Sequence, residues 1–168
     1  MASLVSIIIV AHNQIALTQR CVESIIRHTT IPYELILVDN GSTDSSLEYF
    51  LNLEAVVLHN AQNVSYAKAL NMGIHAAKGD VLVFLNNDLV ITPNWLSNMI
   101  CCLESNPQIG MVGPVSNYSH TTALPGSPSA AGPLMEQFAM AHNVSEPSKW
   151  FEIETFIPGF CLVIPSKV

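Results

Sequence analysis

Charge is scarce in this sequence, and positive charge is the scarcest. Only 11% of the 168 residues are charged, with six Lys and Arg against 13 Asp and Glu, so the formal net charge is −7. A nucleic-acid-binding surface needs clustered basic side chains, so the composition disfavours nucleic acid as a partner. An anionic ligand would have to be held by backbone amides, by a helix terminus or through a bound cation.

Long hydrophobic runs are also missing, although 49% of the residues are hydrophobic and the mean hydropathy is +0.37. No run approaches the ~20 apolar residues that cross a bilayer as a helix. The first residues, MASLVSIIIVAHNQ, have neither the basic start nor the small-residue cleavage site of a secretion signal. We therefore expect no transmembrane segment, and we interpret the apolar run at 5–10 as a buried strand.

Motifs of several common protein classes are absent. The four cysteines form no CxxC pair, which disfavours a disulfide framework or a zinc site and indicates reduced thiols in the cytoplasm. No GxGxxG follows the first apolar run, and the chain has neither a Walker A sequence nor a GxSxG motif. Dinucleotide-dependent dehydrogenases, P-loop NTPases and α/β-hydrolases are therefore disfavoured.

What the sequence does have is a regular alternation of strand and helix patterns. Short β-branched apolar runs alternate with stretches whose apolar residues recur at helical spacing. This alternation predicts an α/β fold with a mostly parallel sheet and right-handed crossovers. The expected strands are 5–10, 34–38, 55–58, 81–85 and 109–112, and the expected helices are 16–28, 43–53, 66–77 and 92–104.

Local signals mark the ends of these helices. Ser45 and Glu48 have the spacing of a capping box near the start of the second helix. Gly79 is expected to close the third helix, and Thr92-Pro93 offers an N-cap and a first-turn proline for the fourth. Each of these signals predicts a helix boundary from neighbouring residues alone.

The last third of the chain differs in composition. Residues 105–168 hold eight of the ten prolines, and 116–133 is rich in Ser, Gly, Ala and Pro without an apolar period. A connection of that length is typical of a functional loop or of a disordered segment, and both interpretations stay open. The expected elements here are a short helix at 134–141 and strands at 150–157 and 160–164.

Three polar clusters each come directly after an apolar strand. They are Ala11-His12-Asn13, Asp39-Asn40-Gly41-Ser42 and Asn86-Asn87-Asp88. Each could be an ordinary turn, and His12 taken alone is more typical of a structural residue. Because the carboxyl ends of parallel strands share one edge of a sheet, we expect the clusters to converge on one ligand crevice.

Asp88 is the best candidate for a metal ligand. Mg²⁺ and Mn²⁺ prefer oxygen donors, and they often bind through one or two carboxylates together with substrate phosphates. None of the six basic residues lies in the three clusters. A diphosphate near Asp39 and Asp88 would be repelled without a cation, so the sequence predicts Mg²⁺ or Mn²⁺ as a cofactor.

Three stretches of the chain resemble the family 2 glycosyltransferases, which have the GT-A fold. They are VSIIIVAHN, ELILVDNGSTD and NVSYAKALNMGIHAAKGDVLVFLNNDLVITPNWL, and the LNND form is similar to the rhamnosyltransferase-like branch. The resemblance covers 4–115 well and 156–168 weakly. It implies a GT-A-like, Rossmann-type sandwich with a mostly parallel central sheet flanked by helices. It also implies a nucleotide-sugar-binding region, 1–115, followed by a partial acceptor-side region, 116–168.

The resemblance further implies a nucleotide-binding role for residues that follow the first two strands. Ala11, His12 and Asn13 would line the nucleotide pocket. Asp39 would accept a hydrogen bond from the base, from N3–H of uracil or thymine. The segment 63–71 would pass beneath the nucleotide.

Other roles fall on that segment and on the cluster after the fourth strand. Ser65 and Asn71 would contribute to the nucleotide-sugar site from the segment beneath it. Asn86, Asn87 and Asp88 occupy the position of the family's DxD motif. The resemblance implies that Asp88 binds the metal and that the two Asn side chains lie near the ribose or the diphosphate.

The sequence departs from the family pattern at several positions. Ser65 stands where Gly is usual, His12 replaces a usual Tyr, and Asn86 replaces the first acid of DxD. The acidic motif that supplies the general base in the family is expected after 160–164, and the chain reaches Val168 without it. We therefore assign no catalytic residue, and we expect the isolated chain to be inactive or weakly active.

The implied reaction is inverting, metal-assisted transfer of a sugar from a nucleoside-diphosphate sugar to an acceptor hydroxyl. UDP- or dTDP-sugars are favoured, and the acceptor would be a glycan, a lipid-linked molecule or a protein in cell-envelope polysaccharide biosynthesis. The expected location is the cytoplasm or the inner face of the membrane. The alternative is a non-catalytic module that binds a nucleotide sugar or a partner, which the missing base and the Asn-rich DxD position favour.

Overall fold

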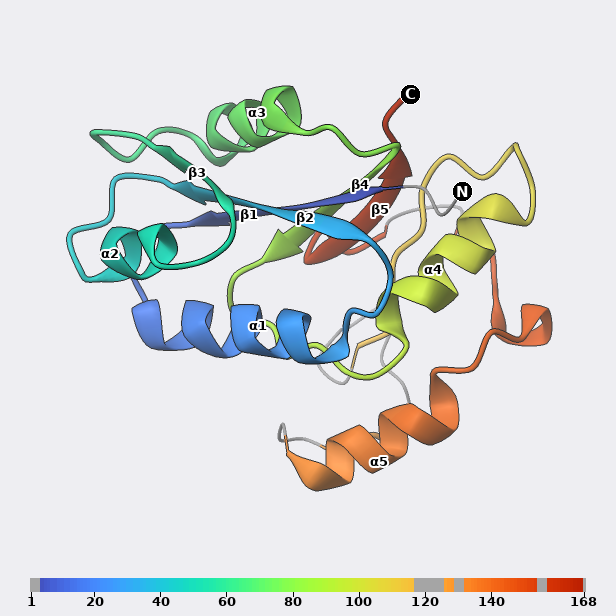
Figure 1. Cartoon of the computed structure of the whole chain (residues 1–168). Coiled ribbons are helices and arrows are strands. Elements are labelled where there is room, and N and C mark those ends of the chain that lie inside the picture. The colour runs from blue at the N-terminus through green and yellow to red at the C-terminus, as the bar shows by residue number, and fades with distance from the viewer. Residues whose placement is uncertain (1–3, 117–125, 129–131, 154–156, 168) are drawn as a thin grey trace.

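A five-stranded sheet forms the centre of the protein (Figure 1). The computed structural model of the chain describes residues 4–116, 126–128, 132–153 and 157–167. The strands are β1 (Val5–Ala11), β2 (Tyr33–Asp39), β3 (Val56–His59), β4 (Val81–Asn86) and β5 (Cys161–Pro165), in the order β3-β2-β1-β4-β5. The first four strands pair in parallel and β5 runs antiparallel to β4, so the expected α/β fold with a mostly parallel sheet is confirmed.

Helices cover both faces of this sheet (Figure 1). One face carries α1 (Ile15–His28), α2 (Ser46–Leu51) and α4 (Trp95–Glu104), and the other carries α3 (Tyr66–Ala76). α5 (Pro133–His142) lies beyond α1, farther from the sheet, and is followed by the short 3-10 helix η1 (Pro147–Lys149). Oε1 of Glu136 in α5 lies 3.6 Å from Nη1 of Arg27 and 3.6 Å from Nε2 of His28. These contacts place α5 beside the carboxyl end of α1.

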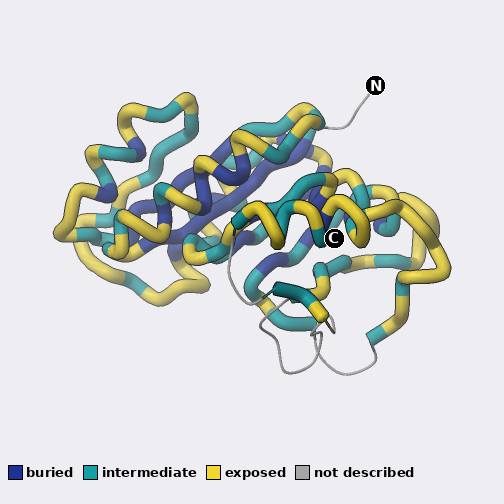
Figure 2. Tube along the Cα trace, turned by 90° about the horizontal axis from the view of Figure 1, so that it is seen from below, coloured by how far each residue is buried: buried dark blue, intermediate teal, exposed yellow. Residues whose placement is uncertain are grey.

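The core lies on both sides of β1, the central strand. All seven residues of β1 are buried, as expected for a strand that is covered by helices on each face. Ile7 and Ile9 pack in the larger core with α1, α2 and α4, whereas Val10 packs with Val38 and Ala69 toward α3. In Figure 2 the buried part of the trace follows the strands, and the outer faces of the helices are exposed.

Gly79 does not close α3 in the expected way. α3 ends at Ala76, the next residue is extended, and Gly79 does not have a positive φ. A Cβ atom on Gly79 would instead lie 2.7 Å from the carbonyl oxygen of Leu4 and from the backbone nitrogen of Ser6. Close packing against the start of β1, and not helix capping, therefore explains the glycine.

The expected capping box at Ser45 and Glu48 is also wrong. Ser45 precedes α2, but its side chain makes no capping hydrogen bond. The carboxylate of Asp44 takes that place, because it accepts the backbone N–H of Ser46 at 3.0 Å and that of Ile15 at 3.1 Å. One acid thus caps α2 and joins it to the start of α1.

The fourth helix begins later than the Thr92-Pro93 signal predicts. α4 starts at Trp95, after Asn94 in the left-handed conformation with a φ of 62°. The amide nitrogen of Asn143 donates to the hydroxyl of Thr92 at 3.0 Å and to the carbonyl oxygen of Pro93 at 2.8 Å. These contacts from the segment after α5 hold the two residues outside the helix.

The expected strand at 109–112 is reduced to a single bridge. Val112 and Val163 exchange backbone hydrogen bonds of 2.9 and 2.8 Å, and no regular strand is formed. The next antiparallel pair would need the N–H two residues further along, at Pro114, and proline has none. The pairing therefore stops after one residue.

The remaining expectations for the last third of the chain have mixed outcomes. The helix at 134–141 and the strand at 160–164 are confirmed as α5 and β5. The expected strand at 150–157 is not formed in its described residues, and the rest of it lies outside the described part of the chain. Most of the 116–133 loop also lies outside the described residues, so its role stays a prediction.

Candidate functional site

The carboxyl ends of neighbouring strands bring the three polar clusters together. Ala11 of β1 pairs with Asp39 of β2, Val10 pairs with Asn86 of β4, and Asp39 pairs with His59 of β3. The chain adds β2 and β3 on one side of β1 and β4 on the other, so the switch in strand order lies between β1 and β4. This is where open parallel sheets bind ligands.

Asn40 joins the end of β2 to the loop after β3. Its buried amide nitrogen donates to Oδ1 of Asn63 and to the carbonyl oxygen of Val64, both at 2.9 Å. Its oxygen accepts from Nδ2 of Asn60 at 3.0 Å and from the backbone N–H of Val64 at 3.1 Å. Both donors and both lone-pair positions of the carboxamide are used, so Asn40 organises the edge of the sheet.

Gly41 allows the turn after β2 to pass close to this loop. Its φ of 75° is in the left-handed region, and a Cβ atom would lie 2.5 Å from the backbone nitrogen of Asn63 and from the carbonyl carbon of Gln62. A side chain at this position would be strained and would collide with backbone. The Asp-Asn-Gly-Ser sequence therefore forms one contact surface with the loop after β3.

Asn13 joins the loop after β1 to the loop after β2. It has a left-handed φ of 58°, which Asn adopts more readily than most residues. Its Oδ1 accepts the backbone N–H groups of Thr43 at 2.8 Å and Asp44 at 3.3 Å, and its own N–H donates to the Ser42 hydroxyl at 2.8 Å. The side-chain oxygen of Asn13 is thus committed within the protein.

His12 has a defined tautomer and an exposed ring. Its Nδ1 lies 3.0 Å from the carbonyl oxygen of Asn40, and because a carbonyl only accepts, Nδ1 carries the proton. Nε2 then accepts from Nδ2 of Asn13 at 3.3 Å. Ala11, the third member of this cluster, is buried and contributes its carbonyl oxygen, which accepts the N–H of Asn40 at 2.8 Å.

Asp39 is fully buried and is paired with a residue that the sequence analysis did not single out. Its Oδ2 lies 2.7 Å from Nδ1 of His59, and its Oδ1 accepts the N–H of Ser42 at 3.3 Å. The side chain of His59 is 45% exposed. A signal for His59 did exist, because it directly follows the expected strand at 55–58 and so falls on the same edge of the sheet.

The cluster after β4 has fewer contacts. Asn86 is half-buried, and its backbone N–H donates to the carbonyl oxygen of Phe160 at 2.9 Å. The Nδ2 of Asn87 donates to the buried hydroxyl of Thr18 in α1 at 2.9 Å. Asp88 is exposed, and no residue in the described ranges hydrogen-bonds to its carboxylate. Its oxygens are therefore free to bind a ligand.

These residues fit a hard divalent cation only in part. The described residues contain no group of three or more His, Cys, Asp and Glu side chains that could hold a metal. The Asp88 carboxylate and the side-chain oxygens of Asn86 and Asn87 are the oxygen donors of the kind that Mg²⁺ or Mn²⁺ prefers. With one carboxylate, the site would need further oxygen ligands from a bound phosphate.

Ser65 follows Val64, which bonds to Asn40, whereas Asn71 lies farther along, in α3. Ser65 precedes α3 with a φ of −58°, which any residue adopts, so the serine introduces no backbone strain there. Asn71 is exposed in the second turn of α3. No hydrogen bond between described residues joins either side chain to the other predicted site residues.

The buried thiol of Cys21 lies next to the β4 cluster but is not a candidate nucleophile. Its Sγ donates to the carbonyl oxygen of Asn86 at 3.5 Å. Burial, together with the nearby negative charge of Asp88, raises the pKa of Cys21 to about 12. Burial also raises the pKa of Cys161. Both thiols are therefore protonated near neutral pH and act as core residues.

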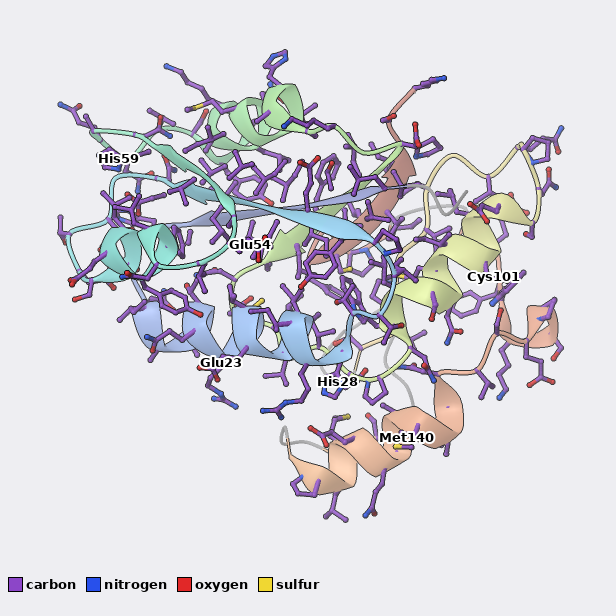
Figure 3. All side chains as sticks on the ribbon, in the orientation of Figure 1. Glu23, His28, Glu54, His59, Cys101 and Met140 are labelled. Carbon is purple, nitrogen blue, oxygen red and sulfur yellow. The ribbon has the colours of Figure 1, made fainter. Side chains whose placement is uncertain are left out.

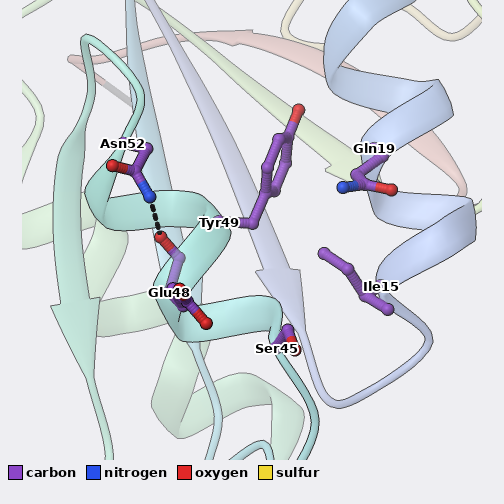
Figure 4. Close-up of a pocket in the computed structure, with 6 residues that line it drawn as sticks. All are labelled: Ile15, Gln19, Ser45, Glu48, Tyr49 and Asn52. Atoms are coloured by element: carbon purple, nitrogen blue, oxygen red, sulfur yellow. Dashed lines mark hydrogen bonds between the residues drawn. The ribbon is translucent and has the colours of Figure 1, made fainter.

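A separate pocket lies between α1 and α2 (Figure 4). Its volume is about 240 Å³, and none of its lining residues belongs to the three clusters. The residues that line it are Ile15, Gln19, Ser45, Glu48, Tyr49 and Asn52. The candidate site is thus the exposed edge of the sheet and not this pocket.

The strand order and the helices on both faces define an open α/β sandwich, and comparison with known proteins gives the family. The model of the glycosyl transferase family 2 matches residues 6–167, so the chain belongs to that family. Glycosyltransferase GlyG of Streptococcus pneumoniae is 30% identical over 126 residues, which are 72% of this chain and 42% of GlyG.

Solved structures of other proteins share the fold. The mannosyltransferase PcManGT from Pyrobaculum calidifontis, in complex with GDP-Man and Mn²⁺, aligns with a TM-score of 0.61 at 23% identity over 69% of this chain and 36% of that one. TarS of S. aureus, residues 1–349 with UDP-GlcNAc, aligns with a TM-score of 0.60 at 21% identity over 73% and 37%. The chain spans less than half the length of GlyG, PcManGT or this TarS fragment.

These findings confirm the family and the GT-A-like fold that the resemblance implied. The rhamnosyltransferase-like branch and the roles of individual site residues stay predictions. Helices in the described ranges are all too short or too polar to cross a membrane.

Proposed function

We propose that this chain binds a nucleoside-diphosphate sugar along the carboxyl edge of its sheet, for metal-assisted, inverting transfer of the sugar to an acceptor hydroxyl. UDP- or dTDP-sugars are the favoured donors, and the acceptor is a glycan, a lipid-linked molecule or a protein. The observation that carries the proposal is the line of polar groups across neighbouring strand ends, from buried Asp39 to exposed Asp88. The GDP-Man and UDP-GlcNAc complexes of similarly folded proteins support a nucleotide-sugar donor.

The order of the strands suggests how the donor lies. The base is placed at the end of β2 near Asp39, the ribose near 11–13, and the diphosphate near 86–88. β2 and β4 are two strand spacings apart, which is about 10 Å. An extended nucleoside diphosphate spans a distance of this order, so both ends of the ligand would be engaged together.

A divalent cation suits the diphosphate end of this arrangement. The Asp88 carboxylate would hold Mg²⁺ or Mn²⁺, with the side-chain oxygens of Asn86 and Asn87 close by. When bound, the cation supplies positive charge to the leaving diphosphate. The chain itself offers little such charge, because none of its six Lys and Arg residues lies in the three clusters.

The transfer step follows from inversion at the anomeric carbon. The acceptor oxygen bonds to that carbon from the face opposite the diphosphate, the bond from the carbon to the phosphate oxygen breaks, and the nucleoside diphosphate leaves. The proton of the acceptor hydroxyl passes to a carboxylate that acts as general base.

We assign the role of this base to none of the carboxylates in the part of the chain that the structure describes. Glu136 lies near the carboxyl end of α1, Glu146 lies 3.1 Å from Lys149, and Glu104 is the last residue of α4. Helices α1 and α4 follow strands and run back from the carboxyl edge, so Glu104 and Glu136 lie away from the three clusters. We therefore propose that this chain alone binds the donor and transfers the sugar slowly at most.

Calorimetric titration of UDP with and without Mn²⁺ tests the proposed site. We expect Mn²⁺ to strengthen UDP binding by roughly tenfold or more, which is about 1.4 kcal/mol. Asp88→Asn keeps the shape of the side chain and removes its charge, so this variant should lose the Mn²⁺ effect. Asp44→Asn is the matched control, because Asp44 lies at the same edge but caps α2. UDP binding that is equally tight without Mn²⁺ would contradict the role of Asp88.

A further inference from the structure

Asp39, the acid expected to recognise the base, presents no free oxygen at the edge of the sheet. None of its surface is exposed, and both carboxylate oxygens are engaged within the protein. Oδ2 lies 2.7 Å from Nδ1 of His59, and Oδ1 accepts the backbone N–H of Ser42 at 3.3 Å. A base that bonded directly to Asp39 would have to displace one of these partners.

We propose that His59 recognises the base, and that its Nε2 accepts the N3–H of uracil or thymine. This inference rests on the proposed function, because it takes the nucleotide to lie along the carboxyl edge. It makes His59 a specificity-determining residue that contacts the donor. Asp39 then acts through His59 as a positioning residue.

The contacts of Asp39 decide which nitrogen of His59 carries the proton. As a carboxylate, Asp39 only accepts hydrogen bonds. Nδ1 of His59 therefore donates to Oδ2, and in the uncharged tautomer that this bond selects, Nε2 carries a lone pair. Carboxylates fix the tautomer of histidine in the same way at metal sites and in catalytic triads.

His59 is placed where a ligand can reach it. It is the last residue of β3, and Figure 3 labels it at the outer end of that strand. Its side chain is 45% exposed, and within the described ranges nothing hydrogen-bonds to Nε2. β3 lies three strand spacings from β4, about 14 Å, which an extended nucleoside diphosphate with its base can still bridge.

An acceptor at this position distinguishes the pyrimidine bases. Uracil and thymine carry a hydrogen on N3, whereas N3 of cytosine carries a lone pair. Nε2 of His59 would accept a hydrogen bond from N3–H of uracil or thymine. With cytosine, the lone pair of Nε2 would face the lone pair of N3, and no hydrogen bond would form. An acceptor that the bound base removes from water and leaves without a partner disfavours the wrong ligand.

The experiment compares UDP with CDP, which share the ribose and the diphosphate and differ only in the base. With Mn²⁺ present, we expect the unaltered chain to bind UDP roughly tenfold more tightly than CDP, a difference of about 1.4 kcal/mol. A UDP analogue methylated at N3 cannot donate and should bind as weakly as CDP. This analogue tests the inference without any substitution.

Asp39→Asn is the variant that tests the inference most directly. Ser42 N–H still needs an acceptor, so the amide oxygen of the new side chain faces Ser42 and its nitrogen faces His59. That nitrogen donates to Nδ1, which moves the ring proton to Nε2 and turns the base contact from acceptor into donor. The preference for UDP over CDP should disappear or reverse.

A second variant and a control separate the possible outcomes. His59→Gln offers both an acceptor and a donor, so its UDP-to-CDP ratio should fall to near one. Asp88→Asn should weaken both nucleotides and leave their ratio unchanged. A ratio that stays at the unaltered value in both Asp39→Asn and His59→Gln overturns the inference and leaves the proposed function intact. Failure of the unaltered chain to bind either nucleotide overturns the proposed function and the inference with it.

Discussion

The two ends of the polar edge are built in opposite ways. At the ends of β1 and β2, the side chains of Asn13, Asp39 and Asn40 each hydrogen-bond across to another loop or strand. At the end of β4, the side chains of Asn86 and Asp88 make no hydrogen bond within the described ranges. The first end is fixed by the protein, whereas at the second only the side chain of Asn87 is held, by its hydrogen bond to Thr18.

This difference matches the two chemical parts of the proposed ligand. A base is recognised by a few directed hydrogen bonds, which need acceptors and donors that are already in place. A diphosphate carries charge, and burying an unpaired carboxylate to meet it would be costly. In the proposed complex, leaving Asp88 exposed would avoid that cost until a cation and phosphate oxygens completed the coordination. Substitutions at each end test this difference in hydrogen bonding.

The largest effect on stability is expected at the fixed end, from Asn40→Ala. The change removes four hydrogen bonds and leaves the half-buried backbone N–H and C=O of Val64 unpaired. We expect a loss of about 3 kcal/mol in the free energy of unfolding, which lowers Tm by roughly 6–12 °C in a chain of this size. Denaturant and thermal unfolding measure it, and Asn71→Ala on exposed α3 is the control. A loss below about 1 kcal/mol would mean that the four hydrogen bonds of Asn40 contribute little to the free energy of unfolding.

A smaller effect is expected at Asn13, where conformation and hydrogen bonding can be separated. Asn13→Ala loses the contacts to Thr43 and Asp44 and also strains the left-handed backbone, and we expect it to cost about 2 kcal/mol. Asn13→Gly loses the same contacts without the strain, so it should cost about 1 kcal/mol. Equal losses in the two variants, measured by urea unfolding, would show that backbone strain contributes nothing.

The fold followed from the sequence because its signals are local and repeated. Alternating apolar runs and helical periods fix the number and type of most elements from residues close together. α2 is capped by a near neighbour, Asp44. The start of α4, in contrast, is set from a distance, because Asn143 holds Thr92 outside the helix. A capping rule that considers only neighbouring residues has no access to such contacts.

The candidate site was predictable in its location but not in its contacts. Parallel strands must end at a common edge, so the three clusters had to meet once the sheet formed. The pair of Asp39 and His59 depends on β3 lying next to β2 and on a register that sets the two residues opposite each other. Neither strand order nor register can be obtained from the periodicity of a single strand.

The smallest effect on stability is expected at the end of β4, from Asp88→Asn. Because no described residue hydrogen-bonds to this exposed carboxylate, the free energy of unfolding should change by no more than about 0.5 kcal/mol without ligand. With Mn²⁺ and UDP at a hundred times Kd, the unaltered chain should gain about 2.7 kcal/mol, and Asp88→Asn should gain far less. Thermal unfolding of both proteins, each with and without UDP and Mn²⁺, measures the two effects together. A variant destabilised without ligand as strongly as Asn40→Ala would mean that Asp88 is bonded within the fold, and the contrast between the two ends would fail.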